Sequence, residues 1–350
     1  MEKSNSTLQA FPEINSMNSQ ELTAFLTGIG EKPFRAKQIY AWLHQRQAAD
    51  FDEMTDLSKA LRSRLKETSC FTVLKPVQIQ TSKQDGTKKY LYQLADGNRI
   101  ETVFMKYKHG NSVCISSQAG CRMGCRFCAS AIGGLVRNLT PAEMLEQVYR
   151  TEQESGERIS NVVVMGIGEP LDNYENLLKF IELITDEQGR NLSQRSITVS
   201  TCGIVPRIRE LADKKLQITL ALSLHAPSQE KRRMLMPVAE KYDLMEVLKA
   251  CDDYFAKTGR RITYEYSLIR GENDSVKDAQ QLGMLLKGKN CHVNLIPVNP
   301  VKERSFKQPD EETAAAFKNK LEKNRINVTI RREMGRDIDG ACGQLRKKYL

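Results

Sequence analysis

The chain has 350 residues, of which 40% are hydrophobic and 27% charged, so it can bury a sizeable core. Basic residues outnumber acidic ones by 53 to 43, a formal net charge of +10, which favours a polyanionic partner but also suits a solvated basic surface. The N-terminal segment lacks the apolar core of a signal peptide, and no window reaches the roughly 18 apolar residues of a membrane span. We therefore expect a cytoplasmic protein with no membrane partner.

The first part of the chain is predicted to form a small helical domain followed by a β-rich connector. Helical patterning runs from residue 18 to residue 68, with Ser19 as a candidate N-cap. Two strand-like runs, KKYLYQL and RIETVFM, flank the turn sequence DGNR and predict an antiparallel hairpin. We assign residues 1–75 to a helical accessory domain and residues 76–106 to the connector.

From residue 107 to residue 335, strand-like and helix-like runs alternate six times. The strand-like runs are SVCISS, NVVVMGI, SITVST, ITLALSL, ITYEYSL and HVNLIP, with INVTIR as a final strand. Their largely apolar character predicts a parallel sheet. One helix has Thr140 as its cap, Pro141 in its first turn and a capping box closed by Glu143. Six units are too few for a closed eight-stranded barrel, so we predict an α/β fold with a partial (β/α)6 barrel and a C-terminal extension, residues 336–350.

Glycine or polar residues follow most of the predicted strands. Because ligands bind at the carboxyl ends of strands in such folds, these residues mark one rim as the candidate binding face. The candidates are Gly168, Glu169, Ser200, Ser223, Leu224, His225 and Asn299. The segment GIGEP is not a dinucleotide fingerprint, since Leu171 stands where that fingerprint has its third glycine.

A loop after the first strand of the array carries three cysteines, Cys121, Cys125 and Cys128. The odd total of nine cysteines argues against a secreted disulfide framework and favours metal or thiol chemistry. A structural zinc site needs a fourth ligand, for which Cys114 is a candidate. An iron–sulfur cluster is the alternative, because three thiolates leave one iron open to a substrate or cofactor. The spacing favours the cluster and leaves zinc and ordinary core cysteines open. Four further cysteines are expected in the core: Cys70, Cys202, Cys251 and Cys291.

Six motifs in this order resemble the RlmN/Cfr group of radical-SAM RNA methyltransferases: CISSQAGCRMGCRFCAS, MGIGEPLDN, STCGIVP, SLHAP, HVNLIPVNP and DIDGACGQL. The segment Gly168-Glu169-Pro170 resembles the RlmN branch of this group, since Cfr-type enzymes tend to carry alanine at the position of Pro170. The resemblance implies a radical-SAM barrel with a [4Fe-4S] cluster on the three loop cysteines. It also implies that S-adenosylmethionine (SAM) is bound by the strand-end residues, with its amino group at Glu169.

The resemblance further implies that C2 of an adenosine is methylated in 23S rRNA and in tRNA near the anticodon. One SAM would methylate Cys342, and a radical derived from a second SAM would activate that methyl group to add to the base. Glu101 matches the proposed base that removes the C2 proton. Cys114 matches the thiol that releases the product by forming a disulfide bond.

RNA is therefore the expected polyanion, and the helical domain is expected to help bind it. Candidate phosphate contacts are Arg35, Lys37, Arg46, Arg62, Arg64, Lys231, Arg232, Arg233, Arg260, Arg261, Arg331, Arg332, Arg336, Arg346, Lys347 and Lys348. An electron donor such as flavodoxin or ferredoxin would reduce the cluster, and we expect a monomer. Two alternatives remain: a Cfr-type enzyme that methylates C8, and a non-enzymatic zinc-bearing RNA-binding protein.

Overall fold

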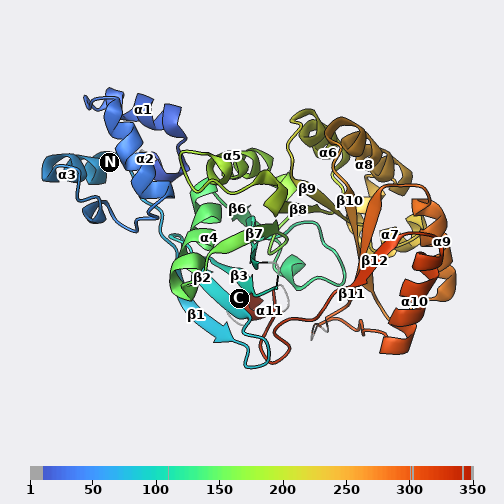
Figure 1. Cartoon of the computed structure of the whole chain (residues 1–350). Helices are drawn as coiled ribbons and strands as arrows, with labels where there is room; N and C mark the ends of the chain where they lie inside the picture. The colour runs from blue at the N-terminus through green and yellow to red at the C-terminus, as the bar shows by residue number, and fades with distance from the viewer. Residues whose placement is uncertain (1–10, 109, 300, 302, 341–342, 348–350) are drawn as a thin grey trace, which may run out of the picture.

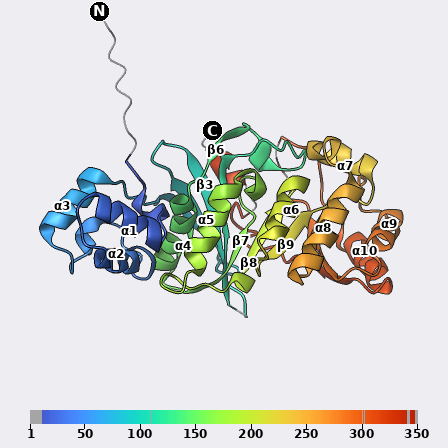
Figure 2. The same ribbon diagram turned by 90° about the horizontal axis from the view of Figure 1, so that it is seen from above.

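The computed structural model describes residues 11–108, 110–299, 301, 303–340 and 343–347, and its architecture is the predicted α/β fold. The N-terminal helices lie at one end of the molecule, and the barrel forms the rest (Figure 1). Seen from above, the molecule is elongated, with the last helices of the barrel at the end opposite the N-terminal helices (Figure 2). None of the helices in the described ranges is both long and apolar enough to cross a membrane.

Three helices form the N-terminal region: α1 (Ser19–Gly28), α2 (Phe34–His44) and α3 (Lys59–Thr68). The N-cap of α1 is Asn18, one residue before the predicted Ser19. The side chain of Asn18 accepts the backbone N–H of Glu21, and Glu21 accepts the backbone N–H of Asn18 at 2.8 Å, which closes a capping box. Cys70 follows α3 in an exposed position, so its predicted place in the core is wrong.

A ten-stranded sheet runs through the molecule in the order β1-β2-β3-β4-β7-β8-β9-β10-β11-β12. Its strands are β1 (Lys75–Thr81), β2 (Lys88–Gln93), β3 (Arg99–Met105), β4 (Asn111–Ile115), β7 (Ile159–Val164), β8 (Ile197–Thr201), β9 (Thr219–Ser223), β10 (Ile262–Leu268), β11 (Cys291–Pro297) and β12 (Asn327–Ile330). From β4 to β12 each neighbouring pair is parallel, as predicted, whereas β1, β2 and β3 extend the sheet in antiparallel fashion. Strand β1 was not predicted, because this edge strand, KPVQIQT, is mostly polar and exposed.

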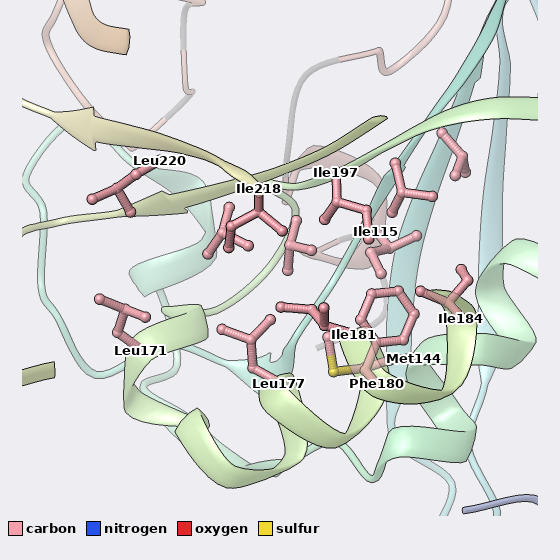
Figure 3. Packing of buried hydrophobic residues seen from close by; sticks show 14 of the residues in the cluster. Ile115, Met144, Leu171, Leu177, Phe180, Ile181, Ile184, Ile197, Ile218 and Leu220 are labelled. Atoms are coloured by element: carbon pink, nitrogen blue, oxygen red, sulfur yellow. The ribbon is translucent and has the colours of Figure 1, made fainter. Parts of the chain in front are cut away.

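Helices cover the outer face of the parallel strands, as expected for repeated βα units. They are α4 (Pro141–Ser155), α5 (Tyr174–Thr185), α6 (Val205–Asp213), α8 (Leu244–Thr258), α9 (Val276–Leu286) and α10 (Glu311–Lys323), whereas the short helix α7 (Gln229–Leu235) lies beside the cysteine loop. Figure 3 shows Phe180, Ile181 and Ile184 of α5 packed against the sheet near Ile115 and Ile197. The opposite face of the strands lines the lumen, so alternate residues of one strand serve packing and chemistry respectively.

The N-terminal helices are fastened to the barrel through α4 and α5. His44 of α2 is fully buried and lies 3.2 Å from the hydroxyl of Tyr149, while Tyr40 donates its hydroxyl to Asp186 at 2.8 Å. Burial lowers the pKa of His44 to about 4. Lys179 of α5 pairs with Glu21 at 2.7 Å. These contacts hold the helices in a defined place beside the barrel.

The C-terminal segment is held by the hairpin of β1 and β2. Asp337 accepts the hydroxyl of Ser82 at 2.6 Å, and the backbone N–H of Asp339 donates to Gln80 at 3.0 Å. The chain then continues to a last short helix, α11 (Gln344–Lys347), which contacts β3. The connector predicted for residues 76–106 therefore positions the end of the chain.

Candidate active site

The loop with the three cysteines lies between β5 (Gln118–Gly120) and β6 (Leu135–Asn138), two short antiparallel strands beyond the end of β4. The backbone N–H of Cys121 donates to Gly134 at 2.9 Å. At Gly120 a Cβ atom would lie 2.0 Å from the carbonyl oxygen of Gly134, and its φ of +85° also favours glycine. On the other side, the backbone N–H of Arg126 donates to Leu235 at 2.9 Å. The loop is thus closed where its two ends meet and is supported near its middle by Leu235.

The thiols of this loop act on one another electrostatically. Burial, with smaller contributions from the neighbouring Cys128 and Glu169, raises the pKa of Cys121 to about 12. Burial also raises the pKa of Cys125, again with contributions from Cys128 and Cys121. In the described ranges no three Cys, His, Asp or Glu side chains are gathered closely enough to hold a metal ion. The donor chemistry fits a [4Fe-4S] cluster, because three soft thiols share one loop and the positive charge of iron would favour their thiolate forms.

The GIGEP segment follows β7 and lies beside the cysteine loop. At Gly168 a Cβ atom would lie 2.7 Å from the side chain of Gln118. Glu169 is 4% exposed, and its carboxylate accepts the backbone N–H of Cys202 at 2.7 Å and that of Leu171 at 3.1 Å. Burial raises the pKa of Glu169, whereas these hydrogen bonds act in the opposite direction. The carboxylate is therefore rigidly placed at the rim.

Polar groups at the ends of β8 and β9 lie together, as predicted. The hydroxyls of Ser200 and Ser223 are 3.4 Å apart. Leu224 is fully buried, and its backbone N–H donates to the carbonyl of Glu265 at 3.0 Å. His225 is also buried, with its ring 4.8 Å from that of Phe127 in the cysteine loop.

The ring of His225 is held in one tautomer. Its Nδ1 accepts the backbone N–H of Ser267 at 2.9 Å, which leaves the proton on Nε2. Burial, together with the nearby charge of Arg232, lowers the pKa of His225 to about 3. A neutral, oriented imidazole is therefore available at this strand end.

A cavity of about 850 Å³ opens between β3 and β4 on one side and β11 and β12 on the other. Cys114 and Asn299 both line it, together with Arg331, Arg332 and Gln344. Cys114 is 5% exposed. The predicted disulfide bond is not borne out, and Cys342, its expected partner, lies outside the described residues.

Glu101 of β3 is hydrogen-bonded to the C-terminal segment. Its carboxylate accepts the backbone N–H groups of Gly343 and Arg346, both at 2.6 Å, and lies 2.9 Å from the ammonium group of Lys89. Glu101 is 3% exposed and Lys89 is fully buried. Gly343, which follows Cys342 in the chain, is thus hydrogen-bonded to the predicted base.

Two of the predicted RNA contacts are wrong, because their side chains are buried in the protein. Arg232 is fully buried and Arg346 is 4% exposed, so neither presents its side chain to a large polymer. Lys231 is partly buried and pairs with Asp278 at 2.7 Å. The side chain of Lys347 and the whole of Lys348 lie outside the described structure. Eight of the remaining candidates are exposed: Lys37, Arg46, Arg64, Arg233, Arg261, Arg331, Arg332 and Arg336.

Two residues of the site were missed from the sequence. Lys89 lies in a strand whose run KKYLYQL looks like a polar edge, yet it faces Glu101 inside the molecule. Glu265 of β10 is 4% exposed and accepts the side-chain amide of Asn294 at 2.8 Å. Burial raises the pKa of Glu265. A single acid inside the apolar run ITYEYSL was the signal that could have identified it.

Comparisons with known proteins match both parts of the chain. Residues 13–71 match the model of the ribosomal RNA large subunit methyltransferase N-terminal domain, and residues 115–282 match that of the radical SAM superfamily. The chain is 64% identical to a "probable dual-specificity RNA methyltransferase RlmN" of Lachnospira eligens, with 97% of each chain covered. A relative of the same name from Clostridium perfringens is 53% identical, with 95% of each covered. A solved radical SAM methyltransferase from Sphaerobacter thermophilus is 42% identical, with a TM-score of 0.92 over 95% of this chain and 98% of that one.

Proposed function

This chain belongs to the RlmN family of dual-specificity RNA methyltransferases, and we propose that it methylates C2 of an adenosine in 23S rRNA and in tRNA near the anticodon. The observation that best supports this activity is the attachment of the C-terminal segment to Glu101. That attachment brings the residue after Cys342 to a buried carboxylate, beside a cavity that Cys114 lines. One methyl acceptor, one base and one resolving thiol are the groups that this chemistry requires.

The family uses a [4Fe-4S] cluster and SAM, which supply the methyl group and the radical chemistry that an unreactive aromatic carbon needs. Cys121, Cys125 and Cys128 would hold the cluster. Glu169 would accept hydrogen bonds from the amino group of SAM. Four further residues at strand ends would complete the SAM site: Ser200, Ser223, His225 and Asn299.

Glu101 would act as the base that removes the proton from C2. In the structure its two oxygens accept two backbone N–H groups of the C-terminal segment and face Lys89, and movement of the segment would remove both N–H groups and leave the carboxylate more basic. The same motion would carry Cys342, which the segment bears. Delivery of the methyl group and release of the base would thus be coupled.

Cys114 would end the cycle by attacking the sulfur of Cys342. The bond between that sulfur and the carbon on the RNA breaks as a disulfide forms between the two cysteines. The carbon keeps the electron pair and takes up a proton to become the methyl group, and a two-electron thiol reductant restores both thiols. Cys114 pairs with Val103 across β3 and β4, two residues along β3 from Glu101. The base and the resolving thiol are therefore close neighbours on adjacent strands.

RNA would reach the cavity along exposed basic groups. Arg331 and Arg332 line the cavity and are exposed. Just after α2 the guanidinium of Arg46 lies over the ring of Trp42 at 4.1 Å, an arrangement that suits contact with phosphate and base alike. The target adenosine must leave its stack to enter. We further propose a cytoplasmic, monomeric enzyme reduced by a flavodoxin or a ferredoxin.

Nucleoside mass spectrometry tests the proposal. Purified chain, reconstituted without oxygen, is incubated with SAM, a one-electron reductant and unmodified 23S rRNA fragments or tRNA. We expect 2-methyladenosine in both RNAs, and none when SAM is omitted. The appearance of 8-methyladenosine would support the Cfr-type alternative, which Pro170 and the names of the relatives do not favour. A protein with zinc and no SAM turnover would overturn the proposal.

A further inference from the structure

Arg232 of α7 has an environment that its place in the sequence does not suggest. Its side chain is fully buried, and its Nη2 donates to the carbonyl of Cys202 at 2.6 Å. Its Nε and Nη1 groups have no hydrogen-bond partner in the described part of the chain. Nor does any described carboxylate form an ion pair with it: the ion pair on this helix belongs to Lys231. A buried cation is thus left with most of its donors unused.

The helix that carries Arg232 is also the support of the cysteine loop. Leu235 accepts the backbone N–H of Arg126, and Leu235 and Met236 form an apolar cluster with Cys125 and Phe127 against them. The guanidinium lies at the turn after β8, since a Cβ at Gly203 would lie 3.2 Å from its Nη2. Cys202 of that turn belongs to the same apolar cluster, against which Cys125 packs, so the guanidinium lies next to the support of the cysteine loop.

Burying a guanidinium without a counter-charge is costly, and a protein keeps such a group only where a negative charge compensates it. Three thiolates around a four-iron core carry net negative charge, and one-electron reduction adds another negative charge without a proton. Net charge and hydrogen bonds around the sulfurs set the potential of such a centre. Arg232 can supply both, because its guanidinium carries a positive charge and its Nε and Nη1 groups are free to donate hydrogen bonds.

We propose that Arg232 is the internal counter-charge of the iron–sulfur centre and favours its reduced state. The side chain is a positioning residue, since it touches neither SAM nor RNA in this role. The electron comes from a low-potential one-electron donor, whose oxidation balances the reduction of the centre. The inference rests on the proposed function, because it requires a cluster on the cysteine loop.

The test compares full-length wild-type chain with Arg232→Met, Arg232→Lys and Arg233→Met, all reconstituted without oxygen. Arg233 is the matched control, because it is the next residue of the same helix but is exposed. Iron and sulfide contents report loading, and a dithionite titration followed by electron paramagnetic resonance gives the midpoint potential. Urea unfolding of each apoprotein reports whether the fold depends on the side chain.

We expect Arg232→Met to load its cluster but to lower the reduced-to-oxidised ratio about tenfold at a fixed potential, equivalent to a shift of about 59 mV to more negative values. Arg232→Lys keeps the charge and should stay near wild type, and Arg233→Met should not shift. Apoprotein stability should not fall with Arg232→Met, since that change removes an unpaired buried charge.

Equal potentials in Arg232→Met and Arg233→Met would overturn the inference and leave the proposed function intact. Loss of the cluster in Arg232→Met but not in Arg232→Lys would support a requirement for the charge, whereas loss in both would refute it. Loss of the apoprotein fold in Arg232→Met would show that the side chain is structural and would also refute it. A wild-type chain that binds no iron and sulfide would refute both the inference and the proposed function.

Discussion

Replacing Glu101 by glutamine should release the C-terminal segment from β3. The carboxylate accepts two backbone N–H groups, from Gly343 and Arg346, and faces the ammonium group of Lys89. Glutamine has the same shape but only one accepting oxygen. Its amino group would point at a donor, so at least one of the three interactions must break.

The size of the effect follows from the bond that is lost. A hydrogen bond to a charged group contributes about 1.5–3 kcal/mol to stability. Loss of one such bond would weaken docking of the segment roughly tenfold to 150-fold. The buried Lys89 would also lose its counter-charge, which adds to the penalty unless the segment moves away and water enters.

Hydrogen–deuterium exchange of the peptide that spans residues 335–347 measures this release. We expect the amides of Gly343 and Arg346 to exchange at least about tenfold faster in Glu101→Gln than in wild type. Asp96→Asn is the control, because Asp96 lies in the turn between β2, which carries Lys89, and β3, which carries Glu101, but pairs with Arg137 at the surface. Exchange in Glu101→Gln as slow as in wild type would show that the carboxylate does not hold the segment.

Three further outcomes are expected. Cys114→Ala should leave RNA covalently joined to the chain, visible as a slowly migrating band on a denaturing gel, and normal turnover would rule out its resolving role. Cys342→Ala should load iron and bind RNA as wild type does but form no methyladenosine by mass spectrometry; product from this variant would exclude Cys342 as methyl acceptor. Stability should fall by up to about 3 kcal/mol as the pH drops from 6.5 to 4, because the unfolded chain protonates His44 before the folded chain does. His44→Phe should flatten that dependence in urea unfolding, and an unchanged slope would argue against it.

Much of the fold follows from local sequence. The capping box of Thr140 and Glu143, with Pro141 in the first turn, defines the start of α4 as predicted. The alternating strand and helix patterns predicted the parallel sheet, because runs of apolar residues bounded by glycine and polar residues constrain each segment by itself. The clustering of Ser200 and Ser223 at one rim followed from the rule that parallel strands end on the same edge.

Other features were not accessible in this way. Strand β1 is polar and exposed, and it forms a strand because β2 offers it an unpaired edge. Helix α4 is buried from Pro141 to Thr151, although its sequence is rich in polar residues, because elements pack on more than one of its faces. Its Gln147 and Glu146 are satisfied by partners on distant segments, Ser116 and Leu74.

The sequence by itself determined the order of the elements, the spacing of the three cysteines and the residues at the strand ends, since each depends on neighbours along the chain. Only the tertiary structure decided which charges are buried and what faces them. Arg232 and Arg233 are adjacent and chemically identical, yet one is buried at the turn after β8 and the other is exposed. Glu101 and Gly343 meet across more than two hundred residues. Burial and pairing depend on how distant segments pack, and that information is shared among many residues and visible in none of them alone.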